Sequence, residues 1–117
     1  MTYVSGFVVP VSNDKRDAYV DAARMAWDVF KDYGALQVVE AWGDDVPEGK
    51  QTDFRRAVDL RDGETVVFSW ILWPDKAVAD RCEAAMKSDQ RFKDMPMPFD
   101  GKRMIFGTFT PIFEAKA

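Results

Sequence analysis

The stretch Glu64–Trp73, with the sequence ETVVFSWILW, decides the fold of this chain. Most of its residues are β-branched or aromatic and Pro74 follows directly, so the stretch predicts one long strand that ends at Trp73. Alternate side chains of a strand point to opposite faces of its sheet. Both sets are largely apolar here: one is Val66, Phe68, Trp70 and Leu72, and the other is Val67, Ser69, Ile71 and Trp73. The strand is therefore expected to be covered on both faces.

The sequence on either side predicts three further strands and a long first helix. The strands are expected at Tyr3–Val11, Leu36–Trp42 and Arg103–Phe113. An apolar stripe at 3.6-residue spacing predicts a helix that follows a cap at Ser12 or Asn13 and runs to about Tyr33. Its stripe consists of Tyr19, Ala22, Ala26, Phe30 and Tyr33, widened by Ala23 and Val29. Gly34 stands where a left-handed C-terminal cap belongs.

A second helix is expected to begin near Pro74 or Asp75 and to fray from Ser88 to Lys93. Its inner stripe is predicted to hold Val78, Cys82, Ala85 and Met86. Residues 52–60 fit either one helical turn or an edge strand, and the sequence leaves both open. Asp62-Gly63 predicts a tight turn, and the proline-rich residues 95–101 predict a loop.

These elements follow one another in the order β-α-β-β-α-β. This order is the ferredoxin-like arrangement, an α+β fold with a four-stranded antiparallel sheet and two helices on one face. A chain of 117 residues has the usual size of one domain, so residues 1–117 are expected to form a single unit.

The second face of the sheet predicts a partner. A sheet with helices on one side only is expected to be polar on the other side, yet the first and last strands are apolar on both faces, like Glu64–Trp73. A bare face of this kind would exceed the apolar patch that a monomer usually exposes. The simplest cover is a second copy, packed sheet against sheet about a two-fold axis, which predicts a homodimer.

The chain has no histidine and one cysteine, Cys82. The absence of histidine excludes Ser-His and Cys-His nucleophiles, a histidine general base, and zinc or haem held by histidine. Cys82 cannot form an intrachain disulfide, and its place on the inner stripe of a helix predicts a buried packing thiol. No cofactor and no metal are expected.

Charge and hydropathy restrict the partners further. The net charge is −4 and no cluster of lysine and arginine offsets it, so nucleic-acid binding is not expected. The first residues have neither a basic region nor a long apolar run, which argues against a signal peptide. The apolar stretch at residues 65–73 is too short to cross a membrane. The sequence predicts a soluble cytoplasmic protein.

Several motifs resemble the YbaA-like family of bacterial proteins, catalogued as domain of unknown function 1428. They are VSGFVVPV at 4–11, GAL at 34–36, VVEAWGDDVP at 38–47, TDFRRAV at 52–58, ETVVFSW at 64–70, WP at 73–74 and MPFDGKRMI at 97–105. They extend over nearly the whole chain. The family is similar to the dimeric α/β-barrel superfamily, and this resemblance implies the fold and the dimer predicted above.

The resemblance does not select an activity. The wider superfamily contains haem-degrading enzymes, cofactor-free monooxygenases, isomerases and proteins without a catalytic role, and a shared fold does not choose among them. Its haem-degrading members use a histidine ligand, which this chain lacks.

Glu40 is the first candidate for a functional residue. On its predicted strand it shares a face with Leu36, Val38 and Trp42, so it is expected to be partly buried. Desolvation raises the pKa of a carboxyl group, which suits it to act as a general base or to hold a ligand. An ion pair with a neighbouring arginine is the alternative.

Arg55 and Arg56 are the next candidates. Adjacent arginines diverge on a strand or a helix, so only one is expected to face a pocket. That arginine could clamp a carboxylate of a ligand, although an ion pair with Glu40 or with the Asp44-Asp45 loop is the favoured interpretation. The two aspartates offer too few oxygen ligands for a metal and predict a solvated turn.

Trp42, Trp70 and Trp73 are the remaining candidates. They could line a cavity between the helices and the sheet, but tryptophan rings are more often part of a core or a dimer interface. The loop Met95–Phe99 could cover such a cavity or contact a partner chain, and the sequence favours neither.

Three interpretations of function follow. In the first, the protein is a homodimer that holds a small hydrophobic or acidic ligand between sheet and helices; the candidate ligand-binding residues are Glu40, Trp42, Arg55, Arg56, Trp70 and Trp73. In the second, it is a cofactor-independent monooxygenase or isomerase that uses Glu40 with an arginine and a tryptophan. In the third, it is an interaction or scaffold protein without a ligand.

Overall fold

The predicted order of strands and helices is confirmed by a computed structural model that describes residues 1–117. The strands are β1 (Tyr3–Ser12), β2 (Gln37–Trp42), β3 (Glu64–Trp73) and β4 (Ile105–Phe109). The long helices are α1 (Arg16–Asp32), preceded by the 3₁₀ turn η1 (Asn13–Lys15), and α3 (Lys76–Ala85). Two one-turn helices, α2 (Phe54–Ala57) and α4 (Gln90–Lys93), lie in the connections.

The four strands form one antiparallel sheet in the order β2-β3-β1-β4. Its register places Glu40, Ser69, Phe7 and Phe106, one from each strand, in a single row across the sheet. Residues paired in this way point to the same face. Phe7 packs against the buried cluster that contains Ala79 and Cys82 of α3, so the row lies on the side of the sheet that carries the helices. We call this side the helix-facing face and the other side the open face.

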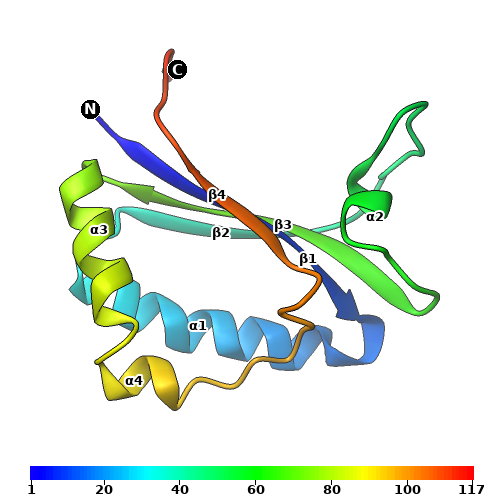
Figure 1. Cartoon of the computed structure of the whole chain (residues 1–117), viewed down its shortest axis with the longest axis horizontal. Coiled ribbons are helices and arrows are strands. Elements are labelled where there is room, and N and C mark those ends of the chain that lie inside the picture. Colours follow the sequence, from blue (N-terminus) through cyan, green and yellow to red (C-terminus); the bar gives the residue numbers. More distant parts are fainter.

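The two faces are covered very differently (Figure 1). Helices α1, α3 and α4 lie on one side of the sheet, whereas α2 and the C-terminal segment project from the opposite side at its two ends. The helix-facing core has two clusters: Tyr3, Ala35, Ile71, Trp73, Ala79 and Cys82, and Val9, Val11, Tyr19 and Val67. Burial of these side chains against the sheet is the main source of stability in a domain of this kind.

A third cluster lies on the open face. It contains Val8, Val58 and Val66, with Val46 and Leu60 packed against it. The connection between β2 and β3 therefore folds back over one end of the open face and covers it from within the chain. The rest of this face is uncovered, so the expectation of an entirely bare second face is corrected to a partly bare one.

Local chemistry explains where the helices begin and end. Asp53 accepts a hydrogen bond from the Arg56 backbone N–H at 2.7 Å, so residues 52–60 contain a capped helical turn rather than an edge strand. Asp75 caps α3 in the same way through the Val78 N–H. Gly34 has a φ of +105°, as its predicted capping role requires.

Four boundaries differ from the sequence prediction. Neither Ser12 nor Asn13 makes a side-chain cap, because η1 intervenes before α1. Residues 90–93 form the separate helix α4 instead of a frayed end, because Asp89 caps it through the Arg91 N–H at 2.9 Å. Met86 follows the end of α3 and is exposed rather than buried.

The last strand is the fourth difference, since it covers Ile105–Phe109 instead of Arg103–Phe113. At its start, Arg103 is held in a turn by the bond from its N–H to the Asp100 carbonyl. Just beyond its end, Pro111 has no N–H to donate to the sheet.

Candidate functional site

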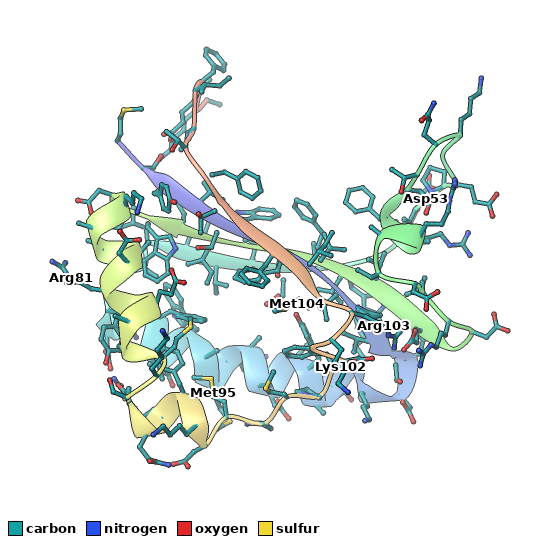
Figure 2. All side chains as sticks on the ribbon, in the orientation of Figure 1. Asp53, Arg81, Met95, Lys102, Arg103 and Met104 are labelled. Carbon is teal, nitrogen blue, oxygen red and sulfur yellow. The ribbon has the colours of Figure 1, made fainter.

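The six residues predicted from sequence do not form one site. Glu40, Trp42 and Trp73 lie on the helix-facing face, Trp70 lies on the open face, and Arg55 and Arg56 lie in α2 beyond the open face. Figure 2 shows this separation: Asp53, next to the two arginines, is on the α2 projection, while Met104 lies on the side of the sheet nearer α1. The predicted grouping of Glu40 with an arginine and three tryptophans is therefore corrected.

Glu40 is instead grouped with two hydroxyl side chains. The Tyr19 hydroxyl, which comes from α1, donates a hydrogen bond of 3.0 Å to Glu40 Oε2. Ser69 lies directly across the strand pair from Glu40, and its hydroxyl helps to lower the pKa of that carboxyl. We call Tyr19, Glu40 and Ser69 the carboxylate site. Tyr19 and Ser69 are buried, whereas Glu40, on the edge strand β2, is exposed as a residue, so the expected partial burial holds only for its hydrogen-bonded carboxylate.

The surroundings alter both titrating groups. Burial raises the pKa of the Glu40 carboxyl, and the hydrogen bonds from Tyr19 and Ser69 only partly oppose this effect. Burial also raises the pKa of the Tyr19 hydroxyl, and the negative charge of Glu40 raises it further. Tyr19 therefore stays a proton-bearing donor across the physiological range, while Glu40 is a more basic carboxylate than one in water.

Tyr19 is held in place by packing. It belongs to the buried cluster with Val9, Val11 and Val67, and the Phe99 ring meets its ring edge-on at a centroid distance of 6.0 Å. The Met95–Phe99 loop thus packs, through Phe99, onto its own chain beside the carboxylate site. Two residues along β2, Trp42 lies under the Arg16 guanidinium at 5.4 Å.

The row of paired residues that begins at Glu40 and crosses the sheet ends in two aromatic residues. Phe7 of β1 and Phe106 of β4 stack with their centroids 6.5 Å apart. Phe106 is 72% exposed although it is on the helix-facing face. The helices therefore leave β4 uncovered on this face, and the row passes from a carboxylate at one sheet edge to an accessible aromatic pair at the other.

The two arginines of α2 have a local role. Arg56 pairs with Asp53 at 2.9 Å, and these contacts lower the pKa of Asp53 to about 2, chiefly through the hydrogen bond from the Arg56 backbone. The predicted ion pair of an arginine here is thus made with Asp53 and not with Glu40 or the Asp44-Asp45 loop. Arg55 is exposed.

The remaining two tryptophans serve in packing. The Trp73 indole is buried and donates a hydrogen bond of 3.0 Å to Ser5 Oγ. Trp70 packs edge-on against Phe68, which in turn meets Phe54 of α2. Trp73 therefore belongs to the helix-facing core, and Trp70 to an aromatic group on the open face.

Arg103 fixes the segment that leads into β4. Its guanidinium makes two bonds to the Glu64 carboxylate, of 2.6 and 2.8 Å, and also contacts Asp100 and the Asp59 carbonyl. The Arg103 hydrogen bonds lower the pKa of Glu64. This bidentate pair joins the beginning of β3 to the segment that carries Phe99, and so helps to hold Phe99 against Tyr19.

Sequence reasoning missed Tyr19 and Ser69 as site residues. Tyr19 was assigned to the apolar stripe of its helix, and Ser69 to the same strand face as Val67 and Ile71. The available signal was the few hydroxyls in otherwise apolar sets, because a buried hydroxyl has to be satisfied by a partner. No group of three or more acidic or cysteine side chains suited to a metal occurs, and none of the helices is both long and apolar enough to span a membrane.

Residues 2–101 match the family described as "Protein of unknown function (DUF1428)". The chain belongs to the DUF1428 family. This DUF1428 protein is 53% identical over 116 residues to the protein named "Uncharacterized protein YbaA" of Escherichia coli (strain K12), an alignment covering 97% of the chain and 99% of the relative. The YbaA protein of Shigella flexneri matches to the same extent.

Solved structures confirm the ferredoxin-like fold of this DUF1428 protein. A dimeric ferredoxin-like protein from an uncultured marine organism has a TM-score of 0.61 at 10% identity, over 98% of this chain and 100% of that one. A structure named "Putative antibiotic biosynthesis monooxygenase" from Nitrosomonas europaea has a TM-score of 0.57 at 13% identity, over 98% and 94%. At such identities the likeness extends to the fold alone.

Proposed function

We propose that this protein is a homodimer, packed through its open sheet faces, that binds a small ligand between sheet and helices at the carboxylate site. The observation that carries the proposal is the Tyr19–Glu40 hydrogen bond, which places a carboxylate on the largely apolar helix-facing face. A partly desolvated carboxylate costs stability, and carboxyl groups with a shifted pKa are enriched at binding and catalytic sites. The proposal keeps the cytoplasmic location expected from the sequence.

The chemistry of the site favours a ligand with a hydrogen-bond donor. Glu40 offers carboxylate oxygens, so a hydroxyl or an amine would bind there, whereas an acidic group would meet like charge. Trp42 on β2 and the Phe7–Phe106 pair offer apolar and aromatic surfaces on the same face for the body of the ligand. Arg55 and Arg56, which would have recognised an acidic ligand, lie beyond the other face. Of the two ligand classes expected from sequence, the hydrophobic one is therefore favoured.

The dimer is supported by the open face. Uncovered apolar side chains on it include Phe68 at 43%, Ile105 at 45% and Phe109 at 58% exposure. Together with neighbouring strand residues they line a shallow apolar depression of about 590 Å³. Solved structures of the same fold include dimeric ferredoxin-like proteins. A second copy would cover this face, as the sequence predicted.

A matched pair of ligands tests the binding site. We expect 1-naphthol, which carries a hydroxyl, to bind more tightly than 1-methoxynaphthalene, which cannot donate a hydrogen bond, when each is titrated by calorimetry. Glu40→Gln should remove most of this difference, because the charged acceptor is lost. Arg55→Gln, outside the site, is the control and should leave both affinities unchanged. Equal binding of the two compounds to the parent protein would contradict the proposed role of Glu40.

A second function, a cofactor-independent monooxygenase or isomerase, is favoured by the raised pKa of Glu40. In that case Glu40 would accept a proton from an acidic C–H or O–H group of the substrate, and the protonated Tyr19 beside it would donate a hydrogen bond to the conjugate base. This function predicts turnover that rises with pH through the Glu40 pKa and is lost in Glu40→Gln. Tight binding without turnover would favour the binding function, and no binding at all would favour a scaffold.

A further inference from the structure

We infer that the C-terminal segment, residues 110–117, is an arm that packs on the partner subunit in the proposed homodimer. This inference rests on the dimer proposed above and adds the element that completes its interface. The arm carries two of the most exposed apolar side chains in the chain, Ile112 at 98% and Phe113 at 84%. Neither contributes to a hydrophobic cluster of its own subunit.

The path of the arm follows from the sequence around it. Pro111 cannot extend the β1–β4 ladder, so pairing ends at Phe109, which is opposite Val4. The Thr2 hydroxyl hydrogen-bonds Glu114 and keeps the arm beside the N-terminus. In Figure 1 the arm then rises away from the helices on the side of the open face. It is thus directed to where a second copy packed on the open face would lie.

The size of the open face gives a reason for the arm. Strands about 4.8 Å apart, with a rise of about 3.3 Å per residue and the strand lengths found here, give a four-stranded face of roughly 500 Å² in projection. Each partner in a standard stable interface contributes about 800 Å². The connection between β2 and β3 already occupies one end of the face. Apolar surface beyond the sheet is therefore needed, and the arm supplies it at the opposite end.

Chemistry on the open face suits the arm side chains. The floor of the depression includes Gly6 and Gly107, which are paired across β1 and β4, and the Phe109 ring lies over both. Eight of the ten lining residues are hydrophobic. Ile112 and Phe113 of a partner subunit would extend this apolar surface, and their burial is favourable because it removes apolar area from water.

The test measures the dimer dissociation constant of full-length variants by sedimentation equilibrium. The double variant Ile112→Ser, Phe113→Ser should raise this constant by about 100-fold or more, because two arms lose two apolar side chains each. Met25→Ser is the control, since Met25 is 49% exposed on α1, away from the open face. It should change the constant by less than about 3-fold.

Two further results separate failure of the arm from failure of the dimer. If the parent protein is dimeric and Ile105→Glu dissociates it while the arm variant does not, the arm inference is wrong and the sheet-face dimer stands. If the parent is monomeric, both are wrong. A photo-crosslinking phenylalanine at position 113 should give covalent dimers, and only intramolecular products would show that the arm packs on its own subunit and overturn the inference.

Discussion

The two faces of this sheet are both largely apolar, but their polar side chains are placed differently: on the open face they lie only at strand ends, as Gln37 and Glu64 do. On the helix-facing face, hydroxyls and a carboxylate are paired in three places: Tyr19 with Glu40, Tyr3 with Thr108, and Trp73 with Ser5. The open face is lined by valine, phenylalanine, tryptophan, isoleucine and glycine. A face with satisfied polar groups can recognise a ligand by its chemistry, whereas a uniformly apolar face is suited to being covered. This difference is why we propose binding on one face and assembly on the other.

The largest expected effect comes from placing a charge on the open face. Ile105→Glu would bury two carboxylates in the proposed dimer interface, and we expect the dissociation constant to rise by about 1,000-fold or more. Ile105 is 45% exposed in the subunit, so the fold should tolerate the change. Circular dichroism checks the fold, and sedimentation equilibrium measures the constant. Met25→Glu on α1 is the matched control, and an unaltered dimer in Ile105→Glu would remove the open face from the interface.

The helix-facing core should respond through stability instead of assembly. Ile71 is 3% exposed in the core cluster with Trp73 and Cys82, and Ile71→Ala should lower the free energy of unfolding by about 3 kcal/mol. Urea denaturation in the monomeric Ile105→Glu background isolates this effect from dimerisation. Leu36→Ala, at a position 55% exposed, should cost less than about 1 kcal/mol in the same background. Equal losses for the two variants would contradict the assignment of the core.

A smaller loss of stability is expected when Arg103, which holds the segment that carries Phe99 beside Tyr19, is replaced. Arg103→Lys keeps the charge but cannot make the bidentate contact with Glu64. We expect a lower melting temperature and faster amide exchange in residues 95–104, with the dimer intact. Arg61→Lys, at an exposed position directly before the Asp62-Gly63 turn, is the control. Unchanged exchange in Arg103→Lys would show that the segment is held by Phe99 and Met104 alone.

The smallest expected effect is on stability at the carboxylate site. There a substitution should stabilise the protein, whereas the core and Arg103 variants destabilise it. Burial raises the Glu40 pKa, so the folded protein binds a proton more readily than the unfolded chain does, and the ionised carboxylate lowers stability at neutral pH. Glu40→Gln should therefore stabilise the protein at pH 7, by no more than about 0.5 kcal/mol because solvent screens this edge position. The gain should vanish below about pH 4, where Glu40 is protonated. A loss of stability at pH 7 would show that the ionised form is favoured.

Much of the architecture was accessible from sequence, because strand alternation, helical periodicity and capping act locally. The alternation in Glu64–Trp73 predicted both the fold and the second apolar face. Asp75 and Gly34 marked helix ends through backbone contacts within a few residues. The early end of β4 was also readable in principle, since Pro111 has no N–H to donate to the sheet.

The site was less accessible, because it depends on which faces meet. Glu40 was found from its strand face, but its partners Tyr19 and Ser69 come from α1 and β3, and only the register across the sheet brings them together. Arg56 was expected to reach across the molecule and instead pairs three residues away with Asp53. The side of the sheet on which α2 projects determines this, and no local pattern specifies that side.

The central claim is that a second copy covers the open face, and native mass spectrometry of the full chain tests it most directly. At micromolar concentration, the account predicts a species of twice the 13.3-kDa chain mass, converted to the single-chain mass by Ile105→Glu. Extra mass on the parent dimer, released on denaturation, would in addition identify the ligand of the helix-facing site. A parent protein that is monomeric under these conditions would contradict the account, because the open face would then have no second copy to cover it.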